Sequence, residues 1–230
     1  MTNIRSGSYE HDLSVMGCGG NNAKIEGELK SLEKIDTLCG NEFHGYLATI
    51  ETMRLSGVAD EVRVVFAEDM IDNAKSENAP ILENGCGISV SGAVHTLRDP
   101  GSCRVRVFVL AERVELNEVP FMTDQVTLRG VIASKPKYRK TPMGRQITEI
   151  FIAAKNEITG KDSFIPCICW QKTAIEVADW GESDKVELVG RFQSRQFEKV
   201  IDKDKDVREL RTVYEISVHR INRLEIQEES

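Results

Sequence analysis

Short runs in which apolar and polar residues alternate recur along most of the chain. A period of two is typical of strands that bury one face, and turn-forming residues separate the runs. In the first half the predicted strands are residues 43–50, 61–66, 88–94 and 105–109. In the second half they are residues 126–133, 147–153, 163–169, 186–192 and 213–218. The pattern predicts a mainly β protein.

The second half also contains one helical pattern. Ala174, Ile175, Val177 and Ala178 keep helical spacing, and Gly181 follows as a C-terminal stop. Three strands, a helix and two further strands in about 100 residues fit a five-stranded Greek-key OB barrel with its helix between strands three and four. A sandwich more often has seven strands and no helix.

The region before the first predicted strand looks different. Residues 1–40 are rich in Gly, Asn and Ser, with one short amphipathic stretch at residues 28–35 that fits a helix. We therefore predict an N-terminal arm, mobile over residues 1–40.

An internal repeat indicates two barrels in tandem. The segment EFHGYLATI resembles LRGVIASK, with Gly45 opposite Gly130, and GISVSGAVHT resembles KVELVGRFQS, with Gly92 opposite Gly190. A glycine within a strand marks a bend or bulge, which a small barrel needs in order to close. The repeat predicts one OB-like domain at residues 41–118 and a second at 124–226.

Composition restricts the class of protein. The chain has 230 residues, of which 40% are hydrophobic and 29% charged, values typical of a globular protein. No stretch reaches the roughly 18–20 apolar residues that cross a bilayer, and the first residues lack the apolar run of a signal peptide. The six cysteines show no disulfide framework. A cytoplasmic protein without membrane contact is expected.

Charge is distributed unevenly along the sequence. The whole chain holds 30 Lys and Arg and 37 Asp and Glu; residues 124–230 hold 19 and 18 of these, which leaves 11 and 19 for the first 123 residues. The acidity therefore lies in the first half. Residues 125–148 contain no carboxylate and six basic residues, namely Arg129, Lys135, Lys137, Arg139, Lys140 and Arg145. This run suits a phosphate backbone, or else a solvated hairpin whose lysines prevent strand aggregation.

Two aromatic residues in a predicted strand suggest a platform for nucleobases. Phe164 and Trp170 are six positions apart, so both lie on one side of an extended strand. An exposed ring can stack on any base, with about 1–3 kcal/mol per base. Core packing of these rings is the alternative. The neighbouring Ile165 and Ile168 lie on opposite faces of the predicted strand, so they do not show which face is buried. Tyr138, within the basic run, is either a solvated loop residue or a base contact.

Other site chemistries find little support. Cys167 and Cys169 share a strand face, but no nearby residue completes a metal site, so both are expected to be small buried residues. The four histidines stand apart from any nucleophile or ligand set. We therefore expect no catalytic site, no metal and no cofactor, and the protein is not expected to be an enzyme.

Two strings carry a family resemblance. VTLRGVIASKPKYRKTPMGRQITEIFIA and FIPCICWQKTAIEVADWGESDKVELVGRFQSRQF resemble bacterial single-stranded DNA-binding proteins (SSB) in the order and spacing of their motifs. The resemblance covers residues 124–225, and residues 41–116 resemble the same fold more weakly. It implies that Phe164, Trp170 and Phe197 stack on bases, and that Arg139, Lys172 and Arg195 contact phosphates.

Together the basic run, the aromatic residues and the resemblance define a candidate nucleic-acid site. Its residues are Arg129, Lys137, Tyr138, Arg139, Lys140, Arg145, Phe164, Trp170, Lys172, Arg191, Arg195 and Phe197. The predicted function is the coating of single-stranded DNA in replication, recombination or repair, in the cytoplasm at the nucleoid. The first barrel has Arg54 alone where the second has its basic hairpin, so it is expected to act as a pairing partner.

Two expectations concern partners. A dimer of two-barrel chains would supply the four barrels that the family resemblance implies, and replication or repair proteins are candidate partners. The chain stops at EIQEES soon after its last strand, so recruitment through a long tail is not expected. The alternative function is an OB-fold protein-interaction module resembling primosomal accessory proteins, which the acidic first half favours.

Overall fold

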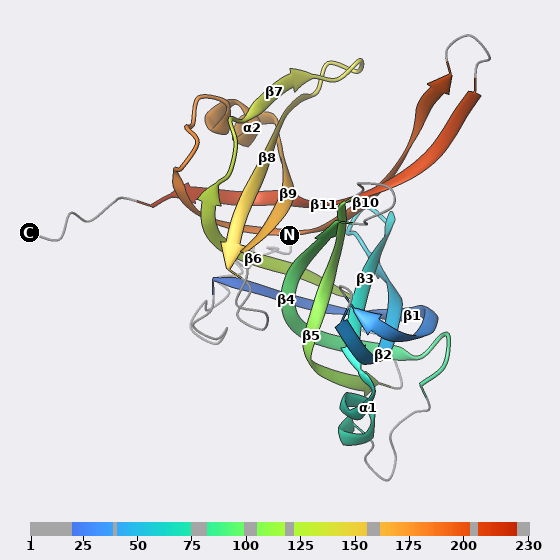
Figure 1. The fold of residues 1–230 in the computed structure, drawn as a ribbon. Helices are drawn as coiled ribbons and strands as arrows, with labels where there is room; N and C mark the ends of the chain where they lie inside the picture. Colours follow the sequence, from blue (N-terminus) through green and yellow to red (C-terminus); the bar gives the residue numbers. More distant parts are fainter. Residues whose placement is uncertain are drawn as a thin grey trace, which may run out of the picture.

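The computed structural model describes residues 20–38, 41–74, 82–98, 105–117, 122–155, 162–202 and 207–224. Its first part comprises β1 (Asn21–Leu38), β2 (Asn41–Met53), β3 (Ala59–Ala67), α1 (Glu68–Ala74), β4 (Gly87–Arg98) and β5 (Val105–Asn117). Its second part comprises β6 (Thr123–Ile132), β7 (Lys137–Lys140), β8 (Gln146–Lys155), β9 (Asp162–Trp170), α2 (Gln171–Ala178), β10 (Lys185–Asp202) and β11 (Val207–Arg223). Figure 1 shows these elements.

The strands form two closed barrels with the same topology. In the first barrel, β1 to β5, the order is β1-β2-β3-β5-β4 and back to β1; in the second barrel, β6 to β11, it is β6-β8-β9-β11-β10 and back to β6. The pairs β3–β5 and β9–β11 are parallel, and the other pairs are antiparallel. Strand β7 pairs with β8 and lengthens a hairpin. The predicted mainly β, OB-type architecture is confirmed.

Alternating burial explains why these segments are strands. In β8 the side chains of Thr148, Ile150, Ile152 and Ala154 are buried, while the residues between them point outward. Helix α2 covers one end of the second barrel, where the Thr148 hydroxyl donates a hydrogen bond of 2.6 Å to the Ala174 carbonyl. The sequence predicted this helix correctly.

Glycines at equivalent places let the strands of each barrel cross closely. A Cβ on Gly130 would lie 2.3 Å from the Ala153 carbonyl oxygen, and a Cβ on Gly27 would lie 2.2 Å from that of Glu51. Gly27, and not Gly45, is therefore the counterpart of Gly130, which corrects the sequence alignment of the repeat. The pairing of Gly92 with Gly190 is confirmed, because a register shift occurs at both.

The predicted N-terminal arm is wrong for the part of it that the structure describes. Residues 21–38 form β1, and the predicted helix at 28–35 is part of this strand. A register shift follows Leu29, so Leu29 and Leu32 pair with Ile50 and Ala48 and face the same side although they are three residues apart. The extra residue of this bulge gives Leu29 and Leu32 the three-residue spacing that is also typical of one face of a helix. Residues 1–19 and 39–40 of the predicted arm lie outside the described residues. Helix α1, in contrast, was not predicted.

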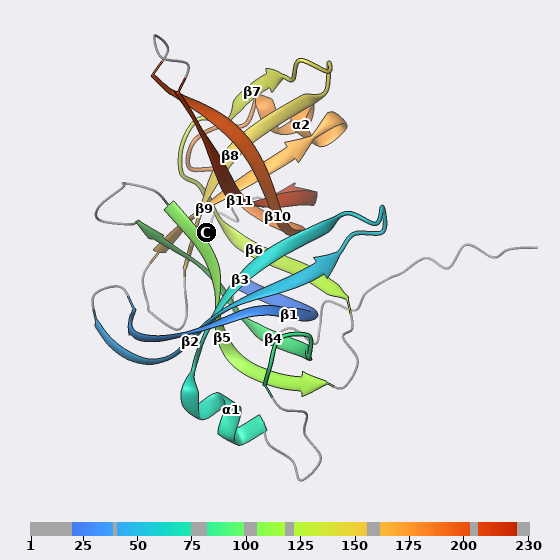
Figure 2. The ribbon, with the colours of Figure 1, turned by 90° about the vertical axis from the view of Figure 1, so that its right-hand side faces the viewer.

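One continuous sheet joins the two barrels. The first residues of β1 pair with both β4 and β6, in registers such as Ala23 with Gly92 and Ala23 with Val126. Figure 2 shows β1 beside β6 between the two barrels. The chain therefore contains a pair of barrels joined strand to strand. The ends of β10 and β11 project from this pair as a long hairpin, on the same side as the β7–β8 hairpin (Figures 1 and 2).

Candidate nucleic-acid interface

The outer face of β7, β8 and β9 brings several predicted residues together. Cross-strand partners share a face of a sheet, and Arg139 pairs with Ile147, which pairs with Trp170. Phe164 lies on the same face of β9 as Trp170. The alternate residues of this strand, namely Ser163, Ile165, Cys167 and Cys169, point into the barrel. We call this outer face, with the β10 and β11 residues next to it, the aromatic face.

The two aromatic residues differ in exposure. The Phe164 side chain is 55% exposed, so core packing does not apply to it. Trp170 is half-buried, and its Nε1 donates a hydrogen bond of 3.2 Å to Ser217 Oγ on β11. Ile147 and Ile168, on the same face, are buried beside it. The indole is thus held at one edge, while Phe164 is open to a ligand.

Basic residues follow the β7–β8 hairpin. Lys137, Lys140, Arg145 and Tyr138 are exposed there, and Lys172 is exposed at the start of α2. Arg139 donates to Glu149 at 2.7 Å. The hairpin is thus a solvated, positively charged edge of the aromatic face, with one carboxylate beside it.

Two further predicted cations are also paired with carboxylates. Arg195 Nε lies 2.9 Å from Glu215, and Arg129 Nη2 lies 3.2 Å from Glu187. Gln193 Nε2 donates to the same Glu215 at 3.2 Å. A phosphate approaching Arg195 would therefore compete with a carboxylate that holds the guanidinium in place.

Arg191 differs from the expectation of an open phosphate contact. It is half-buried, and its Nη1 donates to Asp60 of the first barrel at 2.7 Å and to the Phe192 carbonyl at 2.9 Å. Burial lowers the pKa of Arg191. This residue therefore joins the barrels, a role that the sequence did not indicate because its partner lies 131 positions away.

Asp60 is the centre of that junction. Its fully buried carboxylate also accepts hydrogen bonds from Arg54 Nε at 2.5 Å, from Arg54 Nη2 at 2.6 Å and from the Ser194 backbone N–H at 3.0 Å. Nearby, Asp124 Oδ1 accepts from the Phe192 N–H at 2.8 Å, and Asp124 Oδ2 has no hydrogen-bond partner. Burial raises the pKa of Asp124 to about 7.

Phe151 is an exposed aromatic residue of the same face that the sequence analysis missed. It is 37% exposed on β8 and pairs with Pro166 of β9. The run Ile150, Phe151, Ile152 contained the signal, because successive side chains of a strand alternate between its two faces, so with Ile150 and Ile152 in the core Phe151 faces outward. The side chain of Phe197 lies outside the described residues; its backbone pairs with Arg211 in the long hairpin.

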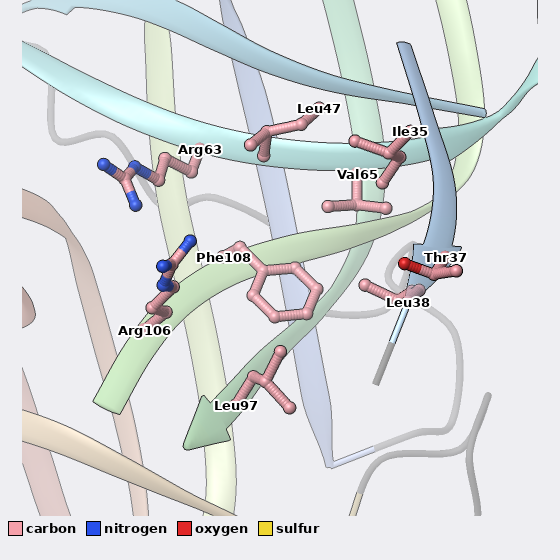
Figure 3. Close-up of a pocket in the computed structure, with 9 residues that line it drawn as sticks. All are labelled: Ile35, Thr37, Leu38, Leu47, Arg63, Val65, Leu97, Arg106 and Phe108. Atoms are coloured by element: carbon pink, nitrogen blue, oxygen red, sulfur yellow. The ribbon is translucent and has the colours of Figure 1, made fainter. Parts of the chain in front are cut away.

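The first barrel presents a different surface at the corresponding place. The parallel pair Val65–Leu110 occupies the position of the pair Ile168–Ser217. Around it lies an apolar pocket of about 160 Å³ that includes Leu47, Leu97 and Phe108. Figure 3 shows the side chains of Arg63 and Arg106 close together at one end of this pocket. The two barrels therefore share a fold, while their outer faces differ.

The cysteines behave as small buried residues. Burial raises the pKa of the Cys169 thiol to about 12 and raises that of Cys167 as well. Both thiols therefore stay protonated at neutral pH. Across the described residues there is no group of three or more His, Cys, Asp or Glu arranged to hold a metal ion. None of the helices in the described part of the chain has the length and apolar character needed to span a membrane.

An OB barrel with an aromatic and basic outer face defines a nucleic-acid-binding type of module. Residues 123–224, which form this barrel, match the single-strand binding protein family. The second barrel is therefore similar in sequence to that family.

Solved structures extend the likeness to both barrels. The wild-type single-stranded DNA-binding protein from Thermus aquaticus is 20% identical, with a TM-score of 0.66, and the match covers 90% of this chain and 94% of that one. A deletion variant of the same protein is 19% identical, with a TM-score of 0.67, and covers 92% and 98%. No curated protein matches the chain in sequence. At this identity the likeness establishes the tandem fold.

Proposed function

We propose that this protein binds and coats single-stranded DNA through the aromatic face of its second barrel. The observation that carries the proposal is the exposed Phe164 on the same face as Trp170, beside the basic β7–β8 hairpin. The match of residues 123–224 to the single-strand binding protein family supports the same function. Roles in replication, recombination or repair follow from coating, because each of these processes exposes single strands.

Binding would combine stacking with neutralisation of phosphates. Bases stack on Phe164 and on the open part of Trp170, and every base offers a π face, so the contact tolerates any sequence. The exposed cations, namely Lys137, Lys140, Arg145 and Lys172, follow the backbone. Arg129, Arg139 and Arg195 would exchange a carboxylate for a phosphate, which gives them less net gain per contact.

Tryptophan fluorescence tests the proposal. Titration with oligo(dT) at low salt should quench the emission strongly, because a base stacks on Trp170 next to its anchored edge. The variant Trp180→Phe should keep this quenching, since Trp180 packs against the barrel core. An unchanged emission together with no binding in a filter assay would refute single-stranded DNA binding.

A dimer of chains is the assembly that we propose. One chain already pairs two barrels through β1 and β6, so two chains would bring four barrels together. Light scattering should then give a mass of about twice 25.8 kDa. A mass of one chain at every concentration used for DNA binding would contradict the dimer.

A protein-interaction role is the second candidate function. The observation that favours it is the apolar pocket of the first barrel, which occupies the place of the aromatic face. Such a pocket suits apolar side chains of a protein partner better than a charged backbone. If oligo(dT) neither quenches nor binds at low salt, this second function becomes the better account of the fold.

A further inference from the structure

A cavity of about 380 Å³ lies between the two barrels, at one end of the aromatic face. The first barrel contributes Thr96 and Val105, at the end of β4 and the start of β5. The second barrel contributes Ser134, Phe151, Asp162 and Phe164. Its volume is within the range of about 300–1,000 Å³ that is typical of small-molecule sites.

The walls of this junction cavity are fixed to each other. His95 Nδ1 and Ser163 Oγ form a buried hydrogen bond of 2.8 Å between the barrels. His95 precedes Thr96, and Ser163 lies between Asp162 and Phe164. The bond therefore connects the two walls of the cavity directly beside it.

Two aromatic rings face the cavity. Phe151 pairs with Pro166 and Ala153 pairs with Phe164, so the two phenylalanines are diagonal neighbours on one face of the sheet. Both side chains are exposed, and Val105 opposite them is 46% exposed. Three exposed apolar side chains around one cavity leave a surface that a flat aromatic ligand would cover.

The polar side chains that line the cavity favour a base over a phosphate as its ligand. Among the described residues that line it, Asp162 is the only ionisable one. A carboxylate repels phosphate, but it accepts a hydrogen bond from the exocyclic amino group of cytosine. Uracil and thymine present a carbonyl oxygen at that ring position, which a carboxylate does not bind.

We infer that the junction cavity is a subsite for one base of the bound strand, and that it prefers a base with an exocyclic amino group. The base stacks against Phe151 and Phe164 and donates its amino hydrogen to Asp162. This inference rests on the proposed single-stranded DNA binding and adds a base preference to it. The subsite needs both barrels, because Thr96 and Val105 form its opposite wall.

Paired homopolymers test the preference. Oligo(dC) and oligo(dU) of equal length differ in the group at ring position 4, so the ratio of their Kd values at fixed salt reports on the amino group. The Asp162→Asn variant should lower the preference for oligo(dC) about threefold or more. The matched control Glu182→Gln removes one exposed charge outside the cavity and should leave the ratio unchanged.

A second variant tests the aromatic wall. Phe151→Leu keeps an apolar side chain at an exposed position, so folding should be unaffected, and the Kd for both oligonucleotides should rise about fivefold or more. Unchanged affinity in Phe151→Leu, or an unchanged ratio in Asp162→Asn, overturns the subsite while wild-type binding persists. Loss of all binding by the wild-type protein would instead refute the proposed function.

Discussion

In the proposed binding mode, Trp170 serves both the fold and the ligand. Its indole N–H is bound to Ser217, and Ile147 lies beside it, so the ring loses little freedom when a base stacks on it. The Phe164 side chain has no polar atom and so cannot form such a hydrogen bond, and it is more exposed than Trp170. The restrained ring should therefore contribute more to affinity per unit of exposed area than the free one.

The first prediction concerns this residue. Trp170→Ala should weaken binding of labelled oligo(dT) by more than about fivefold at fixed salt, the low end of the effect of losing one stacked base. Fluorescence anisotropy measures the change. Trp180→Phe, at the margin of the core, should alter the affinity less than about twofold. An affinity retained by Trp170→Ala would exclude stacking at this position.

A second prediction at this scale is a pH dependence from Asp124. Its pKa is raised from 3.8 to about 7 by burial, so between these values the folded state keeps a proton that the unfolded state has lost. Stability due to this group is present below about pH 4 and falls as pH rises to 7, by up to about 4 kcal/mol at 1.36 kcal/mol per pKa unit. Besides the Phe192 N–H, the charges of Arg191, Arg54 and Asp60 act on it.

Urea denaturation at several pH values measures this effect. The Asp124→Asn variant keeps an acceptor for the Phe192 N–H and cannot ionise, so its free energy of unfolding should vary less between pH 5 and pH 8 than that of the wild type. Identical pH profiles for the two proteins would contradict a raised pKa at Asp124.

At the scale of elements, the contact between β3 and β10 fixes how the barrels meet. Asp60 at the start of β3 binds Arg191 and the Ser194 N–H of β10, and Ser194 Oγ accepts a hydrogen bond of 3.2 Å from the Glu61 N–H. Together with the β1–β6 pairing and the His95–Ser163 hydrogen bond, this contact sets the angle between the two barrels.

The third prediction is the cost of breaking this contact. Asp60→Ala leaves Arg54 and Arg191 without their buried carboxylate, and removing one partner of a buried pair typically costs about 3–5 kcal/mol. The free energy of unfolding in urea should fall by that amount. Asp60→Asn, which keeps an acceptor for the Ser194 N–H, should lose less. A loss below about 1 kcal/mol for Asp60→Ala would show that Asp60 does not hold the barrels together.

Regular elements were predictable from sequence, and irregular ones were not. Strands β6, β8, β9, β10 and β11 and helix α2 follow regular periods, so the sequence predicted them, whereas the short strand β7 was not predicted. The alternation within β9 also predicted that Phe164 and Trp170 share a face. Strand β1 was missed because a register shift after Leu29 breaks its alternation. The role of Arg191 was hidden because Asp60 is distant in sequence, and Phe151 was overlooked among its apolar neighbours.

At the scale of the whole molecule, a net charge of −7 coexists with a basic hairpin on the second barrel. The acidic residues of the first half contribute a long-range repulsion of DNA that salt screens, whereas direct phosphate contacts weaken as salt rises. The local contacts decide affinity, because counterions are released where phosphates are neutralised.

The fourth prediction is therefore a salt dependence. If the proposed binding mode places about four exposed cations on phosphates, log K falls with log salt at a slope of about −3, from about −0.7 per contact. Titrations of oligo(dT) at several salt concentrations give the slope. Lys140→Ala should reduce it by about one contact, while Lys24→Ala, on the first barrel, should leave it unchanged. A slope near zero would mean that phosphates are not bound.

The β1–β6 junction has a consequence for symmetry. A homodimer offers the same surface twice, related by a two-fold axis, so it treats both directions along a bound strand alike. Here the two barrels are parts of one chain and have different outer surfaces, and their association does not weaken on dilution. In the proposed binding mode, a DNA strand that runs from the first barrel to the second meets the two surfaces in the opposite order from a strand that runs the other way. Each chain would therefore distinguish the two directions of a bound strand.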